Sequence, residues 1–507
     1  MALSPMMWTV IYPGQRKKGV FDGMAKFDAT AVLQRLGSPL RELCCDSRRL
    51  VAGDAFLAYP GEHVDGRQYI PQAVLAGASA VFWEPSGFSW PATWQTPNAA
   101  VPELRARAGW LADAVYGAPS AHLFVAAITG TNGKTTVAHL TAALLRQSGR
   151  RAAVLGTLGA GEDDNNMKPT ANTTPEAVEL QRHLRDFVRL GAAAAIIEAS
   201  SHGIAQQRLA GVRLTAAAFC NAGRDHLDYH GSETAYHQCK ASLFTAPDLQ
   251  TGVFNADDDF CAETAQQLAD KMCVRTFGVR GDSLKLTARR EDDAGQELEL
   301  DGSDGRRLIR LPFGGAHNAS NFMAAALLAR AAGATWDSLT PAALTLPNGR
   351  LQQINEDGAP AVYVDYAHTP DALAAVLKTL TVAARRRGGR LRLVFGCGGE
   401  RDIGKRKQMA AAAMAADVVF VTDDNPRGED AAAIRACLMA VGGDDFADIP
   451  RREEAIDEAI AGAAMADIVL IAGKGHETYQ ETALGRRHFS DAEEARHALA
   501  RRTGGSC

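Results

Sequence analysis

The sequence lacks any segment that suggests secretion or a membrane span. No apolar run approaches the roughly 18 residues that a membrane-spanning helix requires. The first 25 residues carry charges where a signal peptide has its apolar core. We therefore expect a cytoplasmic protein without membrane insertion, and we expect residues 1–27 to form an unstructured extension.

Cysteine motifs and a strong charge bias are also lacking. The nine cysteines include no Cys-x-x-Cys pair, and an odd number fits free thiols in a reducing compartment better than a disulfide framework. The net charge of −5 gives no broad basic face, so no nucleic-acid partner is expected. The hydrophobic share of 46% is that of an ordinary globular protein, and 507 residues suffice for about three domains.

What the sequence does contain is a phosphate-binding loop. An apolar run at 123–128 predicts a buried strand, residues 130–136 read GTNGKTT, and a helical pattern follows at 137–145. Such a loop turns backbone N–H groups toward anionic oxygens, and the helix N-terminus adds its dipole. Lys134 can reach the phosphates and Thr135 can hold magnesium. The spacing is shorter than in the general GxxxxGK[ST] loop, and the alternative is a glycine turn with an exposed lysine.

The periodicity of the chain divides it into three parts. Residues 28–118 mix short strands (54–59, 80–84) with a helix (69–75), and the Pro-rich residues 90–102 predict a loop. Residues 119–350 alternate strands with helices, which is typical of a parallel sheet, and 280–310 predict antiparallel hairpins. Residues 351–507 predict a second open α/β domain.

Polar residues follow the predicted strands of both sheets. In open parallel sheets ligands bind beyond the carboxyl ends of strands. Glu198 ends one strand and can help to hold Mg²⁺, and His226 follows another. Thr174 is expected to cap a helix. Lys240 lies on a predicted amphipathic helix, where the pattern alone favours a surface lysine.

Eight motifs occur in one order and resemble the Mur ligases of peptidoglycan synthesis from about residue 33 to 492. They are TGTNGKTT, NTT at 172–174, EASSHG, RDHLDYHG, VDYAHTPDAL, FGCGGERDIGKR, DDNPR and AGKGHE. The resemblance implies a three-domain α/β protein. Its parts are an N-terminal UDP-binding domain (28–118), a central P-loop ATPase domain with a parallel sheet (119–350) and a C-terminal Rossmann-like domain that binds the amino acid (351–507).

The resemblance also implies the reaction. ATP would phosphorylate the D-glutamyl γ-carboxylate of UDP-N-acetylmuramoyl-L-alanyl-D-glutamate, and the amine of meso-2,6-diaminopimelate would attack the acyl phosphate. Phosphorylation gives a poor electrophile a good leaving group, so the protein supplies positioning and charge neutralisation. Mg²⁺ is the expected cofactor, ATP the co-substrate, and a monomer the expected state.

The family's functional positions are then carried over to matching residues. Catalytic roles would fall to Lys134, His226 and a carbamylated Lys240. Metal binding would involve Thr135, Glu198, His226 and Lys240. ATP would contact Gly130, Thr131, Asn132, Gly133, Lys134, Thr135, Thr136, Asn318, Arg350, Asp365 and His368. The UDP-muramoyl dipeptide would contact Ser47, Asn172, Thr173, Thr174, Ser200, Gln206 and Arg208. Diaminopimelate would contact Arg401, Asp424, Asn425, Pro426, Arg427, Gly473 and Glu477.

Arg427 decides which amino acid is expected. Diaminopimelate differs from lysine by a second carboxylate, which a planar guanidinium can bind through two parallel hydrogen bonds. Lysine would leave this guanidinium unpaired. Three positions depart from the family pattern: Gly223 replaces a threonine, Asn348 replaces a proline, and residues 62–64 differ in a loop of the first domain.

Three alternatives remain at this point. The chain could add L-lysine or another amino acid by the same chemistry. It could be a folylpolyglutamate synthetase, although the first domain and the DNPR motif argue against this. It could also be a phosphate-loop switch without ligase activity, but such a switch would not explain Arg401, Arg427 and Glu477 beyond one sheet.

Overall fold

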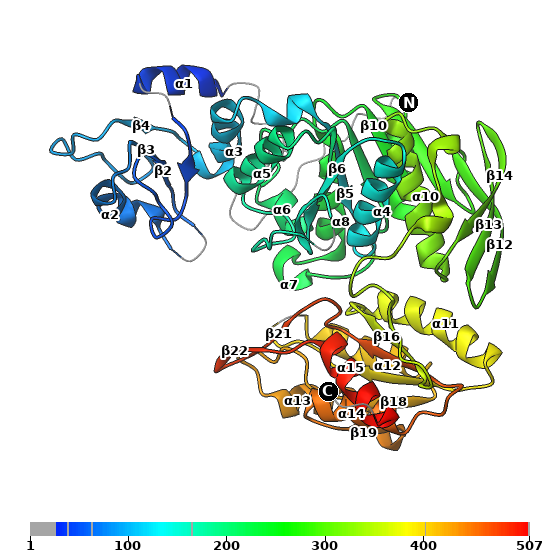
Figure 1. The fold of residues 1–507 in the computed structure, drawn as a ribbon. Coiled ribbons are helices and arrows are strands. Elements are labelled where there is room, and N and C mark those ends of the chain that lie inside the picture. The colour runs from blue at the N-terminus through cyan, green and yellow to red at the C-terminus, as the bar shows by residue number, and fades with distance from the viewer. Residues whose placement is uncertain (1–26, 38–39, 62–63, 164–165, 401, 505–507) are drawn as a thin grey trace, which may run out of the picture.

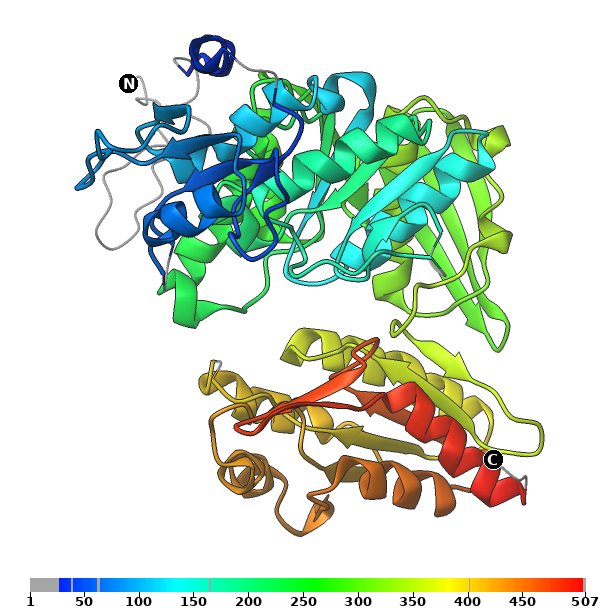
Figure 2. The same cartoon turned by 60° about the vertical axis from the view of Figure 1, so that its left-hand side comes forward.

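The computed structural model describes residues 27–37, 40–61, 64–163, 166–400 and 402–504. Three sheets lie in three successive parts of the chain, and the N-terminal part packs beside the central one (Figure 1). The C-terminal part lies below the central one in two views turned by 60° (Figure 2). Residues 1–26 of the predicted extension lie outside the described residues, whereas Phe27 packs under the Arg107 guanidinium, 5.0 Å from the ring centroid.

The N-terminal part contains a four-stranded parallel sheet in the order β1-β2-β3-β4. Its strands are β1 (Leu43–Cys44), β2 (Ala55–Ala58), β3 (Ala80–Trp83) and β4 (Asn98–Ala100), and its helices are α1 (Ala29–Leu36), α2 (Ile70–Leu75) and α3 (Leu104–Val115). The prediction of a loop throughout 90–102 was wrong for β4. This edge strand has only three residues, and its pairing with β3 outweighs the local Pro-rich composition.

The central part contains a ten-stranded sheet in the order β14-β13-β12-β11-β10-β9-β5-β8-β6-β7. Its strands are β5 (Phe124–Thr129), β6 (Ala152–Gly156), β7 (Gly159–Gly161), β8 (Ala194–Glu198), β9 (Ala216–Phe219), β10 (Thr251–Asn255), β11 (Cys273–Gly278), β12 (Leu284–Asp292), β13 (Gly295–Gly302) and β14 (Gly305–Leu311). The antiparallel pairing of β12, β13 and β14 confirms the hairpins predicted for 280–310.

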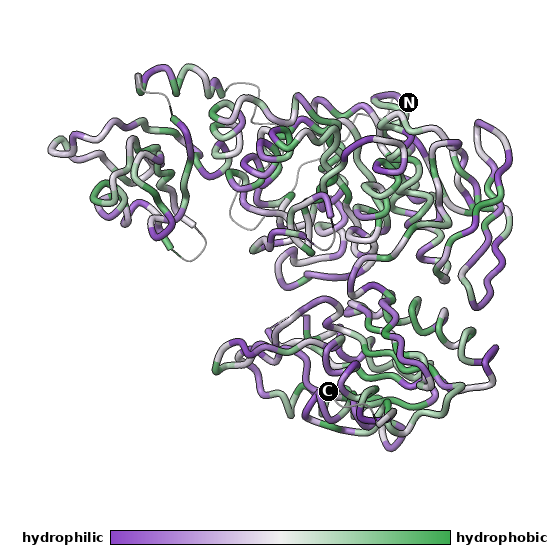
Figure 3. Tube along the Cα trace, in the orientation of Figure 1, coloured by the Kyte–Doolittle hydropathy of each residue, from purple (hydrophilic) through white to green (hydrophobic). Residues whose placement is uncertain are grey.

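Helices cover both faces of the parallel strands in the central sheet. They are α4 (Lys134–Gln147), α5 (Ala177–Arg189), α6 (Ser201–Ala205), α7 (Leu227–His230), α8 (Glu233–Ala241), α9 (Asp259–Leu268) and α10 (Ala316–Ala331). Side chains of α4 and α10 fill one core and those of α5 and α9 fill the other. The strands alternate between these cores, and the tube in Figure 3 is mainly hydrophobic along them.

The predicted cap of α5 was wrong. The helix begins at Ala177, and its N-cap Glu176 makes no side-chain capping bond. Thr174 instead donates its hydroxyl to the carbonyl oxygen of Glu198 at 2.7 Å. A tertiary hydrogen bond to the end of β8 has replaced the local cap, and it holds residues 172–174 against that strand end.

The C-terminal part contains a six-stranded sheet in the order β15-β16-β20-β17-β18-β19, with β15 antiparallel. Its strands are β15 (Gln352–Ile354), β16 (Ala361–Asp365), β17 (Leu391–Phe395), β18 (Val418–Val421), β19 (Phe446–Asp448) and β20 (Ile468–Ala472), and β21 (Tyr479–Thr482) pairs with β22 (Gly485–His488). Its helices are α11 (Pro370–Arg386), α12 (Gly404–Ala413), α13 (Ala431–Gly442), α14 (Arg452–Ala461) and α15 (Asp491–Thr503).

The position of β20 brings distant segments together. This strand lies between β16 and β17, so Asp365 is level with Ala472 at the carboxyl edge. Residues 365–368 and 473–477 therefore leave the sheet side by side. Within the described residues, no helix combines the length and apolarity needed to cross a bilayer, and the eight cysteines there are all free thiols.

Candidate functional site

A cavity of about 1330 Å³ lies where the carboxyl edges of the central and C-terminal sheets face each other. Its lining includes the phosphate loop from Thr131 to Thr136, the end of β8, α8, and the ends of the C-terminal strands. Two ligand-binding edges thus open into one space, as expected for a reaction that joins two substrates.

The phosphate loop connects β5 to α4 as predicted. Gly133 has φ +88°, a conformation that favours glycine, and the helix begins directly after it. The Lys134 ammonium donates to the carbonyl oxygens of Gly130 (2.9 Å) and Thr131 (3.0 Å). Burial lowers the pKa of Lys134. The lysine is therefore folded back on its own loop and must leave these carbonyls to reach a phosphate.

Thr135 and Glu198 form the oxygen-rich side of the loop. The Thr135 hydroxyl donates to Glu198 Oε2 at 2.9 Å, and Arg350 Nη2 donates to that hydroxyl at 3.1 Å. The Thr157 backbone N–H donates to Glu198 Oε1 at 2.8 Å. Glu198 is 1% exposed, and these donors satisfy a carboxylate that is otherwise costly to bury.

Lys240 is a buried residue, so the expectation of a surface lysine from pattern alone was wrong. Its side chain is 1% exposed, its Nζ lies 2.8 Å from the Gly130 carbonyl oxygen, and the Tyr236 ring is 4.4 Å away. Burial, with the nearby charge of Lys134, holds the pKa of Lys240 well below its usual value. A buried lysine amine is thus placed beside the phosphate loop.

His226 precedes α7 with φ +53° and faces other rings. Its ring centroid is 4.7 Å from that of His202, and burial lowers the pKa of His226 to about 3. Asp225, next to it, has a pKa well below the ordinary value. Burial opposes that shift, but a hydrogen bond from His368 and the charge of Lys405 outweigh it. This region therefore combines a neutral imidazole with a carboxylate that remains ionised.

The predicted nucleotide contacts surround the same loop. Asn318 is 3% exposed and donates to the Gly314 carbonyl oxygen at 3.0 Å. Arg350 lies over the Tyr366 ring at 4.4 Å. Asp365 accepts the backbone N–H groups of Leu351 (2.6 Å) and Ala367 (2.7 Å). Its carboxylate thus fixes the segment that carries Arg350, and its own oxygens are engaged by the backbone.

The residues predicted for the dipeptide form a chain of contacts beside β8. Thr173 and Thr157 hydroxyls lie 3.1 Å apart, as do those of Thr174 and Ser200. Arg208 donates to the Thr174 carbonyl oxygen at 2.8 Å and to the Gln206 side chain at 2.6 Å. Ser47 lies in the N-terminal sheet domain, donates to Gln72 at 3.1 Å, and is not among the residues that line the cavity.

The predicted amino-acid site lies at the C-terminal side of the cavity. Lys474, which is fully buried, donates to Asn425 Oδ1 (3.1 Å) and Glu477 Oε2 (3.0 Å), and Asn425 Nδ2 donates to the same Glu477 oxygen at 2.9 Å. Arg427 Nη1 donates to the Gly399 carbonyl oxygen at 2.8 Å, and Nε lies 3.5 Å from Glu481 Oε2. A carboxylate and a guanidinium are therefore held at one rim.

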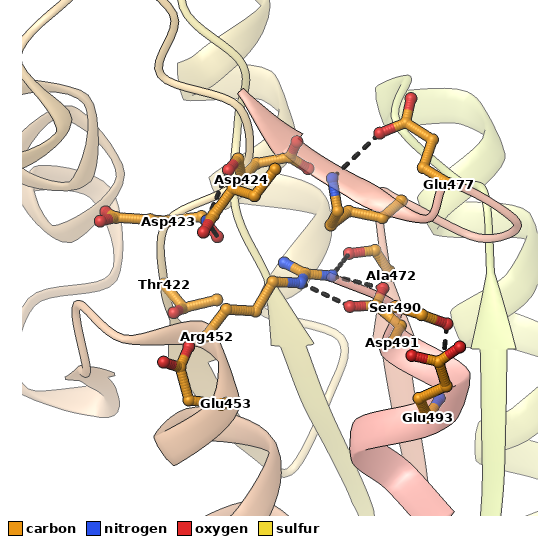
Figure 4. A network of polar contacts seen from close by, with 12 residues as sticks. Thr422, Asp423, Asp424, Arg452, Glu453, Ala472, Glu477, Ser490, Asp491 and Glu493 are labelled. Atoms are coloured by element: carbon orange, nitrogen blue, oxygen red, sulfur yellow. Dashed lines mark hydrogen bonds and ion pairs between the residues drawn. The ribbon is translucent and has the colours of Figure 1, made fainter. Parts of the chain in front are cut away.

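A buried ion pair supports this rim from below. Arg452 and Asp491 are both fully buried and joined at 2.7 and 2.8 Å, and Arg452 also donates to the Ala472 carbonyl oxygen at 2.9 Å (Figure 4). The pair links the starts of α14 and α15 to the end of β20. It fixes the strand end from which residues 473–477 continue.

Comparisons with known proteins decide the family. The Mur ligase family catalytic domain, the Mur ligase middle domain and the Mur ligase glutamate ligase domain match residues 40–116, 128–329 and 349–475. The chain belongs to the Mur ligase family. A Chromobacterium violaceum relative named UDP-N-acetylmuramoyl-L-alanyl-D-glutamate–2,6-diaminopimelate ligase is 44% identical over 475 residues, which cover 92% of this chain and 96% of the relative.

Solved structures agree with this Mur ligase fold. One titled as a UDP-N-acetylmuramoyl-L-alanyl-D-glutamate–2,6-diaminopimelate ligase is 36% identical with a TM-score of 0.64, covering 92% of this chain and 96% of the other. The MurF ligase from Thermotoga maritima in complex with ADP is 17% identical with a TM-score of 0.66, covering 92% and 98%. At that identity the second likeness concerns the fold alone.

The structure of this Mur ligase brings most predicted site residues to one cavity. The lining includes residues from each predicted group: Lys134, Glu198, His226, Lys240, Asn318, Arg350, His368, Asn172, Arg208, Asp424, Arg427 and Glu477. Gly130, Thr174 and Pro426 lie in the adjoining loops and are not part of the lining. Arg401 and residues 62–63 of the divergent loop lie outside the described residues.

Sequence reasoning assigned no individual role to four polar residues that hold this site together. They are Asp225, Lys405, Arg452 and Lys474. Asp225 lies in the RDHLDYHG motif, Lys405 in FGCGGERDIGKR, and Lys474 follows a predicted strand. Their place near the site could therefore have been predicted from the sequence. Arg452 and Asp491 are 39 residues apart, and no local pattern indicates that they pair.

Proposed function

We propose that this Mur ligase joins meso-2,6-diaminopimelate to UDP-N-acetylmuramoyl-L-alanyl-D-glutamate, with ATP, in cytoplasmic synthesis of peptidoglycan precursors. One observation carries the proposal. A phosphate loop and a rim bearing Arg427 and Glu477 share one cavity. The curated relative that is 44% identical over most of both chains bears this activity in its name.

The reaction needs two steps at adjacent places. The γ-carboxylate oxygen of the D-glutamyl residue attacks the γ-phosphorus of ATP, which gives an acyl phosphate and ADP. The neutral amine of diaminopimelate then attacks the acyl carbon, the C–O bond to phosphate breaks, and one amine proton is lost as the amide forms. Lys134 neutralises phosphate charge in the first step, and the protein contributes mainly by positioning and electrostatics.

Two residues beside the phosphate loop supply some of the oxygen ligands that a magnesium ion needs. The Thr135 hydroxyl and the Glu198 carboxylate are hard oxygen donors 2.9 Å apart, the kind of ligand that Mg²⁺ prefers. Across the described residues, no group of three or more histidine, cysteine or acidic side chains is arranged to hold a metal by itself. Bound Mg²⁺ would neutralise phosphate charge, and the substrate phosphates would complete its ligands.

Lys240 would supply a further oxygen ligand once carbamylated. A neutral amine attacks CO₂ and loses a proton to give an anionic carbamate. The low pKa of Lys240 favours the neutral amine, and its Nζ already lies 2.8 Å from the Gly130 carbonyl oxygen. Carbamylation would thus convert a buried amine into an anion beside the phosphate loop, where His226 is a neighbouring ligand candidate.

Arg427 would select diaminopimelate over lysine. Its guanidinium is fixed by Gly399 and Glu481 and lines the cavity near Glu477. The distal carboxylate of diaminopimelate would pair with Arg427, and the distal ammonium would pair with Glu477. The remaining expectations, a monomer in the cytoplasm, form part of the same proposal.

An amino-acid panel tests the proposal. The wild-type chain is supplied with ATP, Mg²⁺, UDP-muramoyl dipeptide and, separately, meso-diaminopimelate, L-lysine or L-ornithine, and the tripeptide product is measured. We expect turnover with diaminopimelate to exceed that with lysine by several orders of magnitude. Better turnover with lysine would assign the other amino acid, and ATP hydrolysis indifferent to every substrate would favour a nucleotide switch.

A further inference from the structure

Asp225 connects the central and C-terminal domains through one carboxylate. Its side chain is only 10% exposed. One oxygen, Oδ1, accepts the His226 backbone N–H at 3.0 Å and lies 3.6 Å from Lys405 Nζ. The other, Oδ2, lies 3.5 Å from His226 Nε2 and 3.8 Å from His368 Nε2. Each oxygen therefore contacts its own neighbour His226 and one group of the C-terminal domain.

A second ion pair of opposite polarity lies next to the first. Arg224 Nε is 3.4 Å from Asp402 Oδ2. The consecutive residues Arg224 and Asp225 of the central domain therefore pair with Asp402 and Lys405, which lie around the start of α12. This alternation specifies one register between the domains, because sliding either segment would bring like charges together.

Two glycines at this contact lie close to side chains of the other domain. A Cβ on Gly404 would lie 3.2 Å from Arg224 Nη2, and a Cβ on Gly223 would lie 2.9 Å from Asp371 Oδ2 of α11. Gly223 therefore has no side chain to meet Asp371, a residue of the C-terminal domain.

Apart from Asp225, few contacts could account for the position of the Lys405 side chain. Its side chain is 16% exposed, and its one ion pair recorded among the described residues is with Asp225. It lines the cavity between the phosphate loop and the amino-acid rim. Partial burial makes an unpaired ammonium costly there, whereas Lys407 on the same helix is exposed.

We propose that Lys405 is a positioning residue for the ligation, which acts through Asp225 to fix His226 and to hold the C-terminal domain in register with the phosphate loop. This inference rests on the proposed function. In this role Lys405 acts through Asp225 and not on a reacting atom. Its effect is on the alignment of the amine, held by one domain, with the acyl phosphate, held by the other.

The test compares Lys405→Met and Lys405→Arg with the matched control Lys407→Met. We expect Lys405→Met to lower kcat by about tenfold, because one charge of a largely desolvated pair is left uncompensated. The KM for ATP should stay unchanged, since the phosphate loop is intact. Lys405→Arg should recover most of the loss, and Lys407→Met should match the wild type.

The outcomes separate this inference from the proposed function. If the wild type ligates diaminopimelate and Lys405→Met keeps wild-type kcat, the inference fails alone. It also fails if Lys405→Arg is as impaired as Lys405→Met, because charge would then not matter. Should Lys405→Met fail to fold, Lys405→Gln replaces it under the same criteria. A wild type that ligates no amino acid overturns the proposed function and this inference together.

Discussion

Lys134 and Lys240 donate to the same carbonyl oxygen, that of Gly130, at 2.9 and 2.8 Å. The two amines come from different helices, and both are in a buried environment that lowers their pKa values. When no phosphate is bound, the Gly130 carbonyl oxygen accepts from both lysine side chains. Phosphate oxygens would be stronger partners for the Lys134 ammonium than this shared carbonyl oxygen.

Lys134→Ala should abolish ligation. The substitution removes the ammonium that compensates phosphate charge, and we expect kcat to fall by at least about 100-fold. Tripeptide formation measured by chromatography provides the readout. Lys407→Ala, which removes an exposed lysine, serves as the control, and near-normal turnover by Lys134→Ala would refute the assigned role.

Lys240→Ala should reduce activity by about 100-fold, because an anionic carbamate that stabilises charge would be lost. Addition of acetate or formate should restore part of the activity by supplying a carboxylate in the vacated space. Wild-type protein in ¹³C-bicarbonate should show a carbamate signal by NMR that the variant lacks. A healthy variant together with an absent signal would contradict carbamylation.

Arg427→Met should change selectivity rather than folding. Loss of the guanidinium leaves the distal carboxylate of diaminopimelate unpaired, so kcat/KM for that substrate should fall on the order of 100-fold. Turnover of L-lysine, which has no such carboxylate, should fall much less. Arg451→Met, at an exposed arginine, is the matched control. An unchanged ratio between the two amino acids would argue against this role.

His230 should make the protein less stable in mild acid. It is 8% exposed, and burial, with the charges of His202 and Lys240, lowers its pKa from 6.5 to about 4. Between these values the unfolded chain binds a proton that the folded chain does not, so the free energy of unfolding falls as pH drops from 6.5 to 4. Urea unfolding at pH 7.5 and 5 measures this loss.

The variant His230→Phe removes the titrating group and should lose less stability between these two pH values than the wild type. His122 is exposed, so His122→Phe should leave the pH dependence unchanged. Equal slopes for the wild type and His230→Phe would show that other groups dominate.

Much of the architecture could be predicted because its signals are local. The phosphate loop is flanked by an apolar strand and a helical pattern, and Glu198 directly ends a buried strand. The hairpins at 280–310 were recognisable from their charged, glycine-rich sequence. These features depend on neighbours within a few residues, which a single sequence records.

The burial of Lys240 could not be predicted from its pattern. An amphipathic helix with one lysine looks the same whether the lysine meets solvent or the phosphate loop, because that depends on how β5 and α8 pack. The same holds for the Arg452–Asp491 pair and for Asp225 with Lys405, which lie 180 residues apart in the chain. Thr174 was misassigned as a cap because its tertiary partner, the Glu198 carbonyl, is invisible to local rules.

The central place of β20 has a consequence for how the polypeptide is made. The C-terminal sheet stays split between β16 and β17 until residues 468–472 have emerged from the ribosome. Nascent chains in which that gap is still open expose two unpaired strand edges, which are prone to aggregate. A nonsense mutation shortly before residue 468 should therefore yield an insoluble product, although the whole ATP-binding loop has already been translated.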